Sequence, residues 1–178
     1  MIDKDTIIQE MIAYHHSSVS IPRTKIYQWM QYKDIDIMGI TADFVTWASY
    51  IERIDEEIEQ KDLEAFLFEY YERCLDEDPD TDWAETRYGA CRTMISWFRA
   101  IPDDVDPASC SFIVHMKDWL TDVYLKSGED IRDAIVAGAL EHILEQKRWW
   151  DFFQDWKENP ALRPAYERAM EWAVDHLE

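Results

Sequence analysis

The sequence contains few residues whose types and spacing could do chemistry, and its histidines are the first to consider. Two of the five stand three residues before a carboxylate, in His115-Met-Lys-Asp118 and His142-Ile-Leu-Glu145. On a helix this spacing places both side chains on one face, so the two pairs could share one metal ion. Carboxylate bundles that hold two iron atoms use the reverse order, Glu-x-x-His, which this chain lacks. We therefore expect capped or half-buried histidines and no metal site.

A dense run of carboxylates, DEDPDTD at residues 76–82, invites comparison with calcium-binding loops. An EF-hand loop needs Gly at its sixth position and Glu at its twelfth. Counting from Asp76 places Thr81 and Arg87 at those positions, and counting from Asp78 also fails at both. We therefore expect no calcium site in this run.

The same run has the chemistry of a connector between two helices. Pro79 does not continue a helix, and Asp82 followed by Glu85 has the spacing of a capping box at the start of the next one. A second connector, IPDDVDP at residues 101–107, is also acidic and bounded by prolines. Two interpretations stay open for these carboxylates: capping and solvated charge, or a docking patch for a basic partner.

Signatures of nucleophilic catalysis and of phosphate binding are absent from the sequence. No GxSxG, HExxH, phosphate loop or GxGxxG occurs anywhere in the chain. A catalytic triad assembled from distant residues would leave no such trace. We predict a protein that is not an enzyme and that needs no cofactor.

The charge balance is strongly acidic. Lys and Arg number 18 against 38 Asp and Glu, which gives a formal net charge of −20, and the excess runs through the whole chain. A field of that sign repels nucleic-acid phosphates and anionic lipid headgroups and attracts cationic partners. We therefore expect no direct binding of nucleic acid or membrane. Solubility alone is the other explanation of the acidity.

Cysteine usage and the first residues of the chain bear on its location. The cysteines, Cys74, Cys91 and Cys110, lack CxxC spacing and fall in helical apolar patterns, so we expect buried thiols in a reducing compartment. The start, MIDKDTIIQEM, lacks the basic and apolar regions of a signal peptide. No apolar run approaches the ~18 residues of a membrane span. These features predict a cytoplasmic protein.

The most conspicuous aromatic stretch is EQKRWWDFFQDWKENP at residues 145–160. Trp149, Phe152, Phe153 and Trp156 are spaced as i, i+3, i+4 and i+7, which is one face of a helix. Burying each contributes roughly 1.5–3 kcal/mol, so we expect this face in the core. Trp150 lies outside the quartet among polar residues, and we expect it to be the exposed one. The stretch also lacks the basic groove of a base-stacking site.

Helical periodicity predicts the fold class. Thr41 is the expected N-cap of one helix, and Gly138 should allow a close backbone approach within an apolar one. Residues 13–40 are the least certain, since KIYQWMQY could be a short helix and IDIMGI a short strand. The apolar stripes cover residues 7–12, 41–58, 63–74, 83–98, 112–123, 129–144, 149–156 and 162–177.

The prediction is an all-α fold over residues 1–178. It takes the form of a compact single-domain bundle, or a short array of helical hairpins, with seven to eight helices.

The C-terminal part carries a resemblance to a known group of proteins. GEDIRDAIVAGALEHILEQ followed by NPALRPAYERA, within about residues 128–170, resembles a pattern of uncharacterised bacterial acidic helical proteins. In that pattern an acidic helix start leads into a small-residue apolar helix, and a final helix follows a Leu-Arg-Pro-like start. The resemblance implies no catalytic residue. It implies an immunity function against bacterial toxins.

These observations together predict a binding protein that neutralises or regulates a basic partner, such as a nuclease toxin. Nuclease active sites must attract phosphate, so an acidic surface complements them. The candidate contacts are the exposed-looking carboxylates of both connectors and one aromatic anchor: Asp76, Glu77, Asp78, Asp80, Asp82, Asp103, Asp104, Asp106 and Trp150.

Three alternatives stay open. A phage-type inhibitor that mimics nucleic acid would space its carboxylates along one face like the phosphates of a duplex. A helical metal-dependent enzyme would hold stoichiometric iron, manganese or zinc. A scaffold or assembly subunit would associate with itself.

Overall fold

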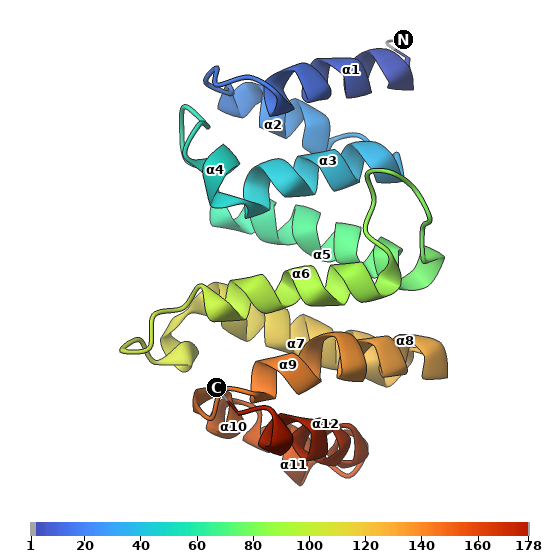
Figure 1. Ribbon diagram of the computed structural model, residues 1–178, viewed down its shortest axis with the longest axis vertical. Coiled ribbons are helices and arrows are strands. Elements are labelled where there is room, and N and C mark those ends of the chain that lie inside the picture. Colours follow the sequence, from blue (N-terminus) through green and yellow to red (C-terminus); the bar gives the residue numbers. More distant parts are fainter. Residues whose placement is uncertain (1–2, 178) are drawn as a thin grey trace. The chain divides into compact units, whose positions relative to one another are not determined.

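The computed structural model describes residues 3–177, and helices joined by connectors account for most of that range (Figure 1). Within it no strand forms, and the single β-bridge joins Ile21 to Ile54. The all-α prediction is therefore confirmed. In the same range, no helix is both long enough and apolar enough to cross a lipid bilayer.

Contacts along the chain divide it into two units, Met1–Thr86 and Arg87–Glu178. Each unit has its own helices and its own buried side chains. That the two units form a single domain stays a prediction.

The first unit contains one long helix and several shorter ones. Its core includes the stacked rings of Trp29 and Phe44, whose centroids lie 5.3 Å apart, and the buried rings of Tyr70 and Tyr71. The short helix expected in KIYQWMQY is confirmed. The helices are α1 (Lys4–His15), α2 (Arg23–Met30), α3 (Ile35–Thr46), α4 (Ala48–Ile51) and α5 (Gln60–Glu77).

Helix α3 corrects the expectation for residues 35–40. IDIMGI is not a strand but the first half of α3, because the Asp34 side chain accepts hydrogen bonds from the backbone amides of Asp36 and Ile37 and caps the helix there. Thr41 is consequently not an N-cap. It is buried inside the helix, and its hydroxyl donates to the Ile37 carbonyl at 2.7 Å.

The single helix expected over residues 41–58 is also wrong, because α3 ends at Thr46 and α4 ends at Ile51. At Trp47 the backbone is extended (φ −84°, ψ 126°). Beyond α4, the Arg53 guanidinium donates to the carbonyls of Tyr14 and Val19, at 2.7 and 2.9 Å. These bonds, together with the bridge at Ile54, hold residues 52–55 against the segment before α2, so the apolar spacing continues there without a helix.

Residues 78–86 form an irregular connector, and the helix expected from Trp83 starts only at Arg87. The capping box of Asp82 and Glu85 is therefore wrong. The Thr81 hydroxyl accepts from the amides of Trp83 and Ala84, and the Glu85 amide donates to the Tyr70 hydroxyl at 2.9 Å. These contacts tie the connector to the core of the first unit.

The second unit contains the remaining helices. Over the described residues of the whole chain, eight helices have seven residues or more, in line with the predicted seven to eight. The helices of this unit are α6 (Arg87–Arg99), η1 (Pro107–Ser109), α7 (Ser111–Lys126), α8 (Glu129–Ile135), η2 (Val136–Leu140), α9 (Glu141–Leu144), α10 (Arg148–Phe152), α11 (Gln154–Glu158) and α12 (Arg163–Asp175).

The apolar segment around Gly138 is buried, as its composition predicts. Residues of η2 have π-helical hydrogen bonding and join α8 to α9. A Cβ atom at Gly138 would lie 2.7 Å from the Cys91 Cβ on α6, so the close approach predicted for this glycine is confirmed.

The three cysteines are free thiols. Cys74 and Cys91 are buried, as expected, and burial raises the pKa of the Cys74 thiol to about 12. Cys110 departs from the expectation, because it is the half-buried N-cap residue of α7.

Candidate functional site

The five carboxylates of residues 76–82, here called the acidic connector, lie at the C-terminal end of α5 and in the loop after it. All five are exposed: Asp76, Glu77, Asp78, Asp80 and Asp82. Asp78 has left-handed backbone angles (φ 46°, ψ 58°), and its amide donates to the Cys74 carbonyl at 3.1 Å. A short polar side chain tolerates this conformation, so Asp78 ends the helix in the place that glycine often takes.

The position of the acidic connector is electrostatically unfavourable. The C-terminal end of a helix carries a partial negative charge, and an acidic side chain there costs roughly 0.3–1 kcal/mol. Glu77 is compensated by Arg73, whose guanidinium nitrogens lie 2.7 and 3.1 Å from its two carboxylate oxygens. The last turn of α5 has no basic residue. Asp78 caps the end of α5, whereas the next helix, α6, begins only at Arg87, beyond the acidic connector.

The second group, Asp103, Asp104 and Asp106, is also exposed and lies in the connector between α6 and η1. Asp106 has a structural role, because its side chain accepts from the Ala108 amide at 3.0 Å and caps η1. Asp103 pairs with Arg148 at 2.8 Å although 98% of its side chain is exposed. This group belongs to the second unit and the acidic connector to the first.

Trp150 is neither fully exposed nor fully buried. Its ring is half-buried, and its indole N–H donates to the Leu144 carbonyl at 2.8 Å. The Lys147 ammonium lies 5.9 Å from the ring centroid. Because the N–H is already bonded inside the unit, any partner would meet the ring alone. The role of Trp150 as an anchor stays a prediction.

Of the aromatic quartet, Trp149, Phe153 and Trp156 are buried, as predicted. Phe152 is only half-buried, and the Lys117 ammonium lies 4.7 Å from its ring centroid. The quartet does not form one helix, because α10 ends at Phe152 and α11 begins at Gln154. The Phe152 carbonyl instead accepts from the Lys117 ammonium at 2.7 Å, which stabilises the break.

The pair His142 and Glu145 comes together as its spacing predicts, with Nδ1 and Oε1 2.8 Å apart. Glu145 is buried, with 8% of its surface exposed, and also accepts from Arg99 Nη2 and Trp172 Nε1, each at 3.2 Å. His115, of the other pair, is exposed. Within residues 3–177, no three His, Cys, Asp or Glu side chains are grouped so that they could hold a metal ion.

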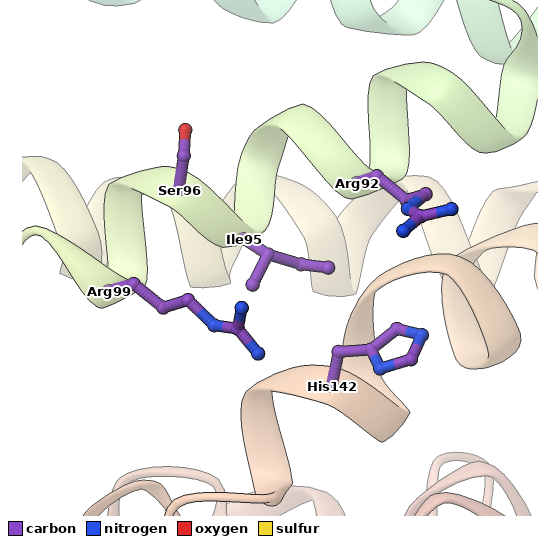
Figure 2. A pocket seen from close by; sticks show the side chains of 5 residues that line it. All are labelled: Arg92, Ile95, Ser96, Arg99 and His142. Atoms are coloured by element: carbon purple, nitrogen blue, oxygen red, sulfur yellow. The ribbon is translucent and has the colours of Figure 1, made fainter.

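One pocket of about 320 Å³ lies between α6 and α9 in the second unit. Its lining residues are Arg92, Ile95, Ser96, Arg99 and His142, which Figure 2 shows from close by. The sequence reasoning missed this site. Arg92 and Arg99 match no known motif. Their spacing of seven residues, which puts both on one face of a helix, was the one feature of the sequence that could have indicated the pocket.

Comparison with the models of known protein families, with curated proteins and with solved structures finds no match to this chain. The resemblance within residues 128–170 therefore assigns no residue a role. Function has to be argued from the chemistry and position of the side chains themselves.

Proposed function

We propose that this chain is a binding protein that neutralises or regulates a basic partner protein through the acidic connector. In the form we favour, it is an immunity protein against a bacterial toxin with nuclease activity, acting in the cytoplasm. Asp103, Asp104 and Asp106 contribute a second acidic surface, and Trp150 contributes an aromatic contact.

The observation that carries this proposal is the position of the acidic connector. Five exposed carboxylates are concentrated in the last turn of α5 and in the loop after it, the helix dipole disfavours those at the helix end, and the loop carboxylates cap no following helix. Such a concentration of like charges repels itself, and this repulsion costs free energy in the free protein. A partner with a basic surface would recover this cost on binding.

The chemistry of a nuclease fits such a surface. An enzyme that cleaves nucleic acid needs a cationic groove that attracts phosphates, and this groove is complementary to a row of carboxylates. Long-range attraction between the two speeds their encounter and weakens as salt screens the charges. The net charge of −20, which is spread over the whole chain, also attracts a basic partner.

Affinity capture from bacterial extract with three baits tests the proposal. The first bait is the wild-type chain, and the second replaces the acidic connector by its amides (D76N, E77Q, D78N, D80N and D82N). The third carries five amide substitutions at exposed glutamates elsewhere (E52Q, E57Q, E72Q, E167Q and E171Q), so that its net charge equals that of the second.

We expect the wild-type chain and the third bait to retain a basic protein that the connector variant loses and that added salt releases. Inhibition of this protein's nuclease activity by the purified chain would identify it as a toxin. A captured DNA-binding protein that exchanges the chain for duplex DNA would point instead to nucleic-acid mimicry. Equal retention by all three baits would contradict the assignment of the acidic connector.

A further inference from the structure

We propose that the pocket between α6 and α9 binds a phosphate group, carried by free phosphate or by a small phosphate monoester. The pocket belongs to the second unit and is lined by basic side chains, whereas the acidic connector belongs to the first unit. The inference is independent of the proposed function.

Helix geometry brings the cationic groups together. Arg92 and Arg99 are seven residues apart on α6, two turns or about 10.5 Å along the axis, and so share one face. Ile95 lies between them and provides the apolar floor, and His142 approaches from α9 (Figure 2). Ser96 points away from His142 in this view, and its hydroxyl donates to the Thr93 carbonyl at 2.6 Å.

Glu145 positions two of the side chains that line the pocket. Its buried carboxylate lies 3.2 Å from Arg99 Nη2 and 2.8 Å from His142 Nδ1. The Trp172 indole N–H holds the same carboxylate from α12, at 3.2 Å. With Nδ1 directed at Glu145, the other ring nitrogen of His142 lies on the far side of the imidazole. Glu145 is thus a positioning residue of this pocket.

Arg92 is the cationic group most available to a ligand. It is exposed at the rim of the pocket, and among residues 3–177 no side chain or carbonyl forms an ion pair or hydrogen bond with its guanidinium. This is unusual in a chain whose 38 acidic residues outnumber its 18 basic ones. Ion pairs hold several other arginines, for example Arg73 with Glu77 and Arg168 with Asp133.

The donor set favours a phosphate group. Guanidinium groups present planar forks that fit phosphate and carboxylate oxygens, and charge-assisted bonds to them are about twice as strong as neutral ones. Two guanidiniums and an imidazole suit a dianion better than a single carboxylate. A volume of about 320 Å³ is at the lower end of small-molecule sites, and the charge of −20 opposes a polyanion such as nucleic acid.

Titration of the full chain with inorganic phosphate at low ionic strength, followed by NMR, tests this inference. We expect saturable shifts of the Trp172 indole N–H and of backbone amides in α6 and α9. Phenyl phosphate serves as the monoester and acetate as a single carboxylate. Tighter binding of phenyl phosphate would assign a small phosphorylated molecule, equal binding would assign free phosphate, and acetate should bind at least tenfold more weakly than phosphate.

Two variants with the same change in charge decide whether the pocket is responsible. Arg92→Gln removes the available guanidinium without breaking a described bond, and should weaken phosphate binding at least tenfold. Lys157→Gln removes an exposed cation outside the pocket and should leave binding within about twofold. Equal weakening by both variants, unmoved signals in α6 and α9, or acetate binding as tight as that of phosphate would overturn the inference.

Discussion

Gly39 lies in α3 where the connector after α5 packs directly on the helix. A Cβ atom there would be 2.1 Å from the Trp83 carbonyl oxygen and 2.9 Å from the Ala84 Cα, which are both backbone atoms. No side-chain rotation can relieve such contacts. The absence of a side chain at this residue thus allows the backbone of Trp83 and Ala84, just after the acidic connector, to pack on α3.

Gly39→Ala should therefore lower the free energy of unfolding by about 1–3 kcal/mol or more, as overpacking of a closed contact does. Urea unfolding followed by circular dichroism measures the change. Gly128→Ala is the control, because a Cβ atom there would meet nothing within 4 Å. Its cost should stay below about 1 kcal/mol, the loss expected for alanine at an N-cap. Equal losses in the two variants would show that the contact at Gly39 is not tight.

Asp43 is a residue whose ionisation opposes folding. Burial raises the pKa of its carboxyl, although the Trp47 indole N–H, which donates to it at 3.0 Å, and the nearby His15 act in the opposite direction. In the folded state the Asp43 carboxyl therefore keeps its proton at pH values where the same group in the unfolded chain has lost it. The free energy of unfolding consequently falls as pH rises from the ordinary value of 3.8 through the raised pKa.

Asp43→Asn keeps an oxygen for the Trp47 indole and carries no charge. We expect it to match the wild type below the ordinary pKa of aspartate and to become the more stable of the two above the raised pKa. Urea unfolding of both proteins between about pH 3 and pH 7 gives this difference, in which the other carboxyl groups cancel. A difference that does not change with pH would contradict this account of Asp43.

At the scale of the elements, one arginine holds the connector between α6 and η1. The Arg148 guanidinium donates to the Ile101 carbonyl at 2.9 Å, to Asp103 at 2.8 Å and to the Val105 carbonyl at 3.4 Å. It also stacks on Trp149, with 4.8 Å from its central carbon to the ring centroid. The second acidic surface therefore depends on α10 for its conformation.

Arg148→Lys keeps the charge but cannot form this set of bonds, because an ammonium lacks the planar fork. We expect amide hydrogen exchange in residues 102–106 to become at least tenfold faster while exchange in α7 stays unchanged. Mass spectrometry of peptide fragments measures both regions. The exposed Lys157→Gln serves as the control and should alter neither. Unchanged exchange in the connector of the Arg148 variant would show that other contacts order it.

Sequence patterns predict elements well here where periodicity and termini agree, as in α5, α7 and α12. They fail where a distant contact outweighs local spacing. The Arg53 bonds to the carbonyls of Tyr14 and Val19 end the expected helix early, and the Tyr70 hydroxyl takes the Glu85 amide that a capping box would use. Neither contact has a local signature.

The candidate sites show the same limit. Exposure of the acidic residues follows directly from their clustering, and the pairing of His142 with Glu145 follows from helical spacing. The pocket cannot be predicted from the sequence in this way, because it forms only where α6 lies against α9. A glycine at residue 138 indicates a close approach but not which helix approaches.

At the scale of the whole molecule, a net charge of −20 opposes compactness through self-repulsion. Raising the salt concentration from about 10 mM to 150 mM shortens the screening length from about 30 Å to about 8 Å. The thermal midpoint measured by calorimetry should therefore rise with salt. The variant with the acidic connector neutralised should have a higher thermal midpoint at low salt, and this midpoint should rise less when salt is added. A midpoint that is independent of salt in both proteins would contradict this role of the charge.

The most direct measurement of the central claim is the rate at which the chain associates with its captured basic partner, followed by stopped-flow fluorescence at increasing salt. The wild-type chain should associate at least tenfold more slowly at about 200 mM salt than at 20 mM, because screening removes electrostatic steering. The variant with the acidic connector neutralised should associate slowly at both concentrations, and the control of equal charge should resemble the wild type. Equal rates and equal salt dependence in all three would contradict the claim that the acidic connector guides the partner.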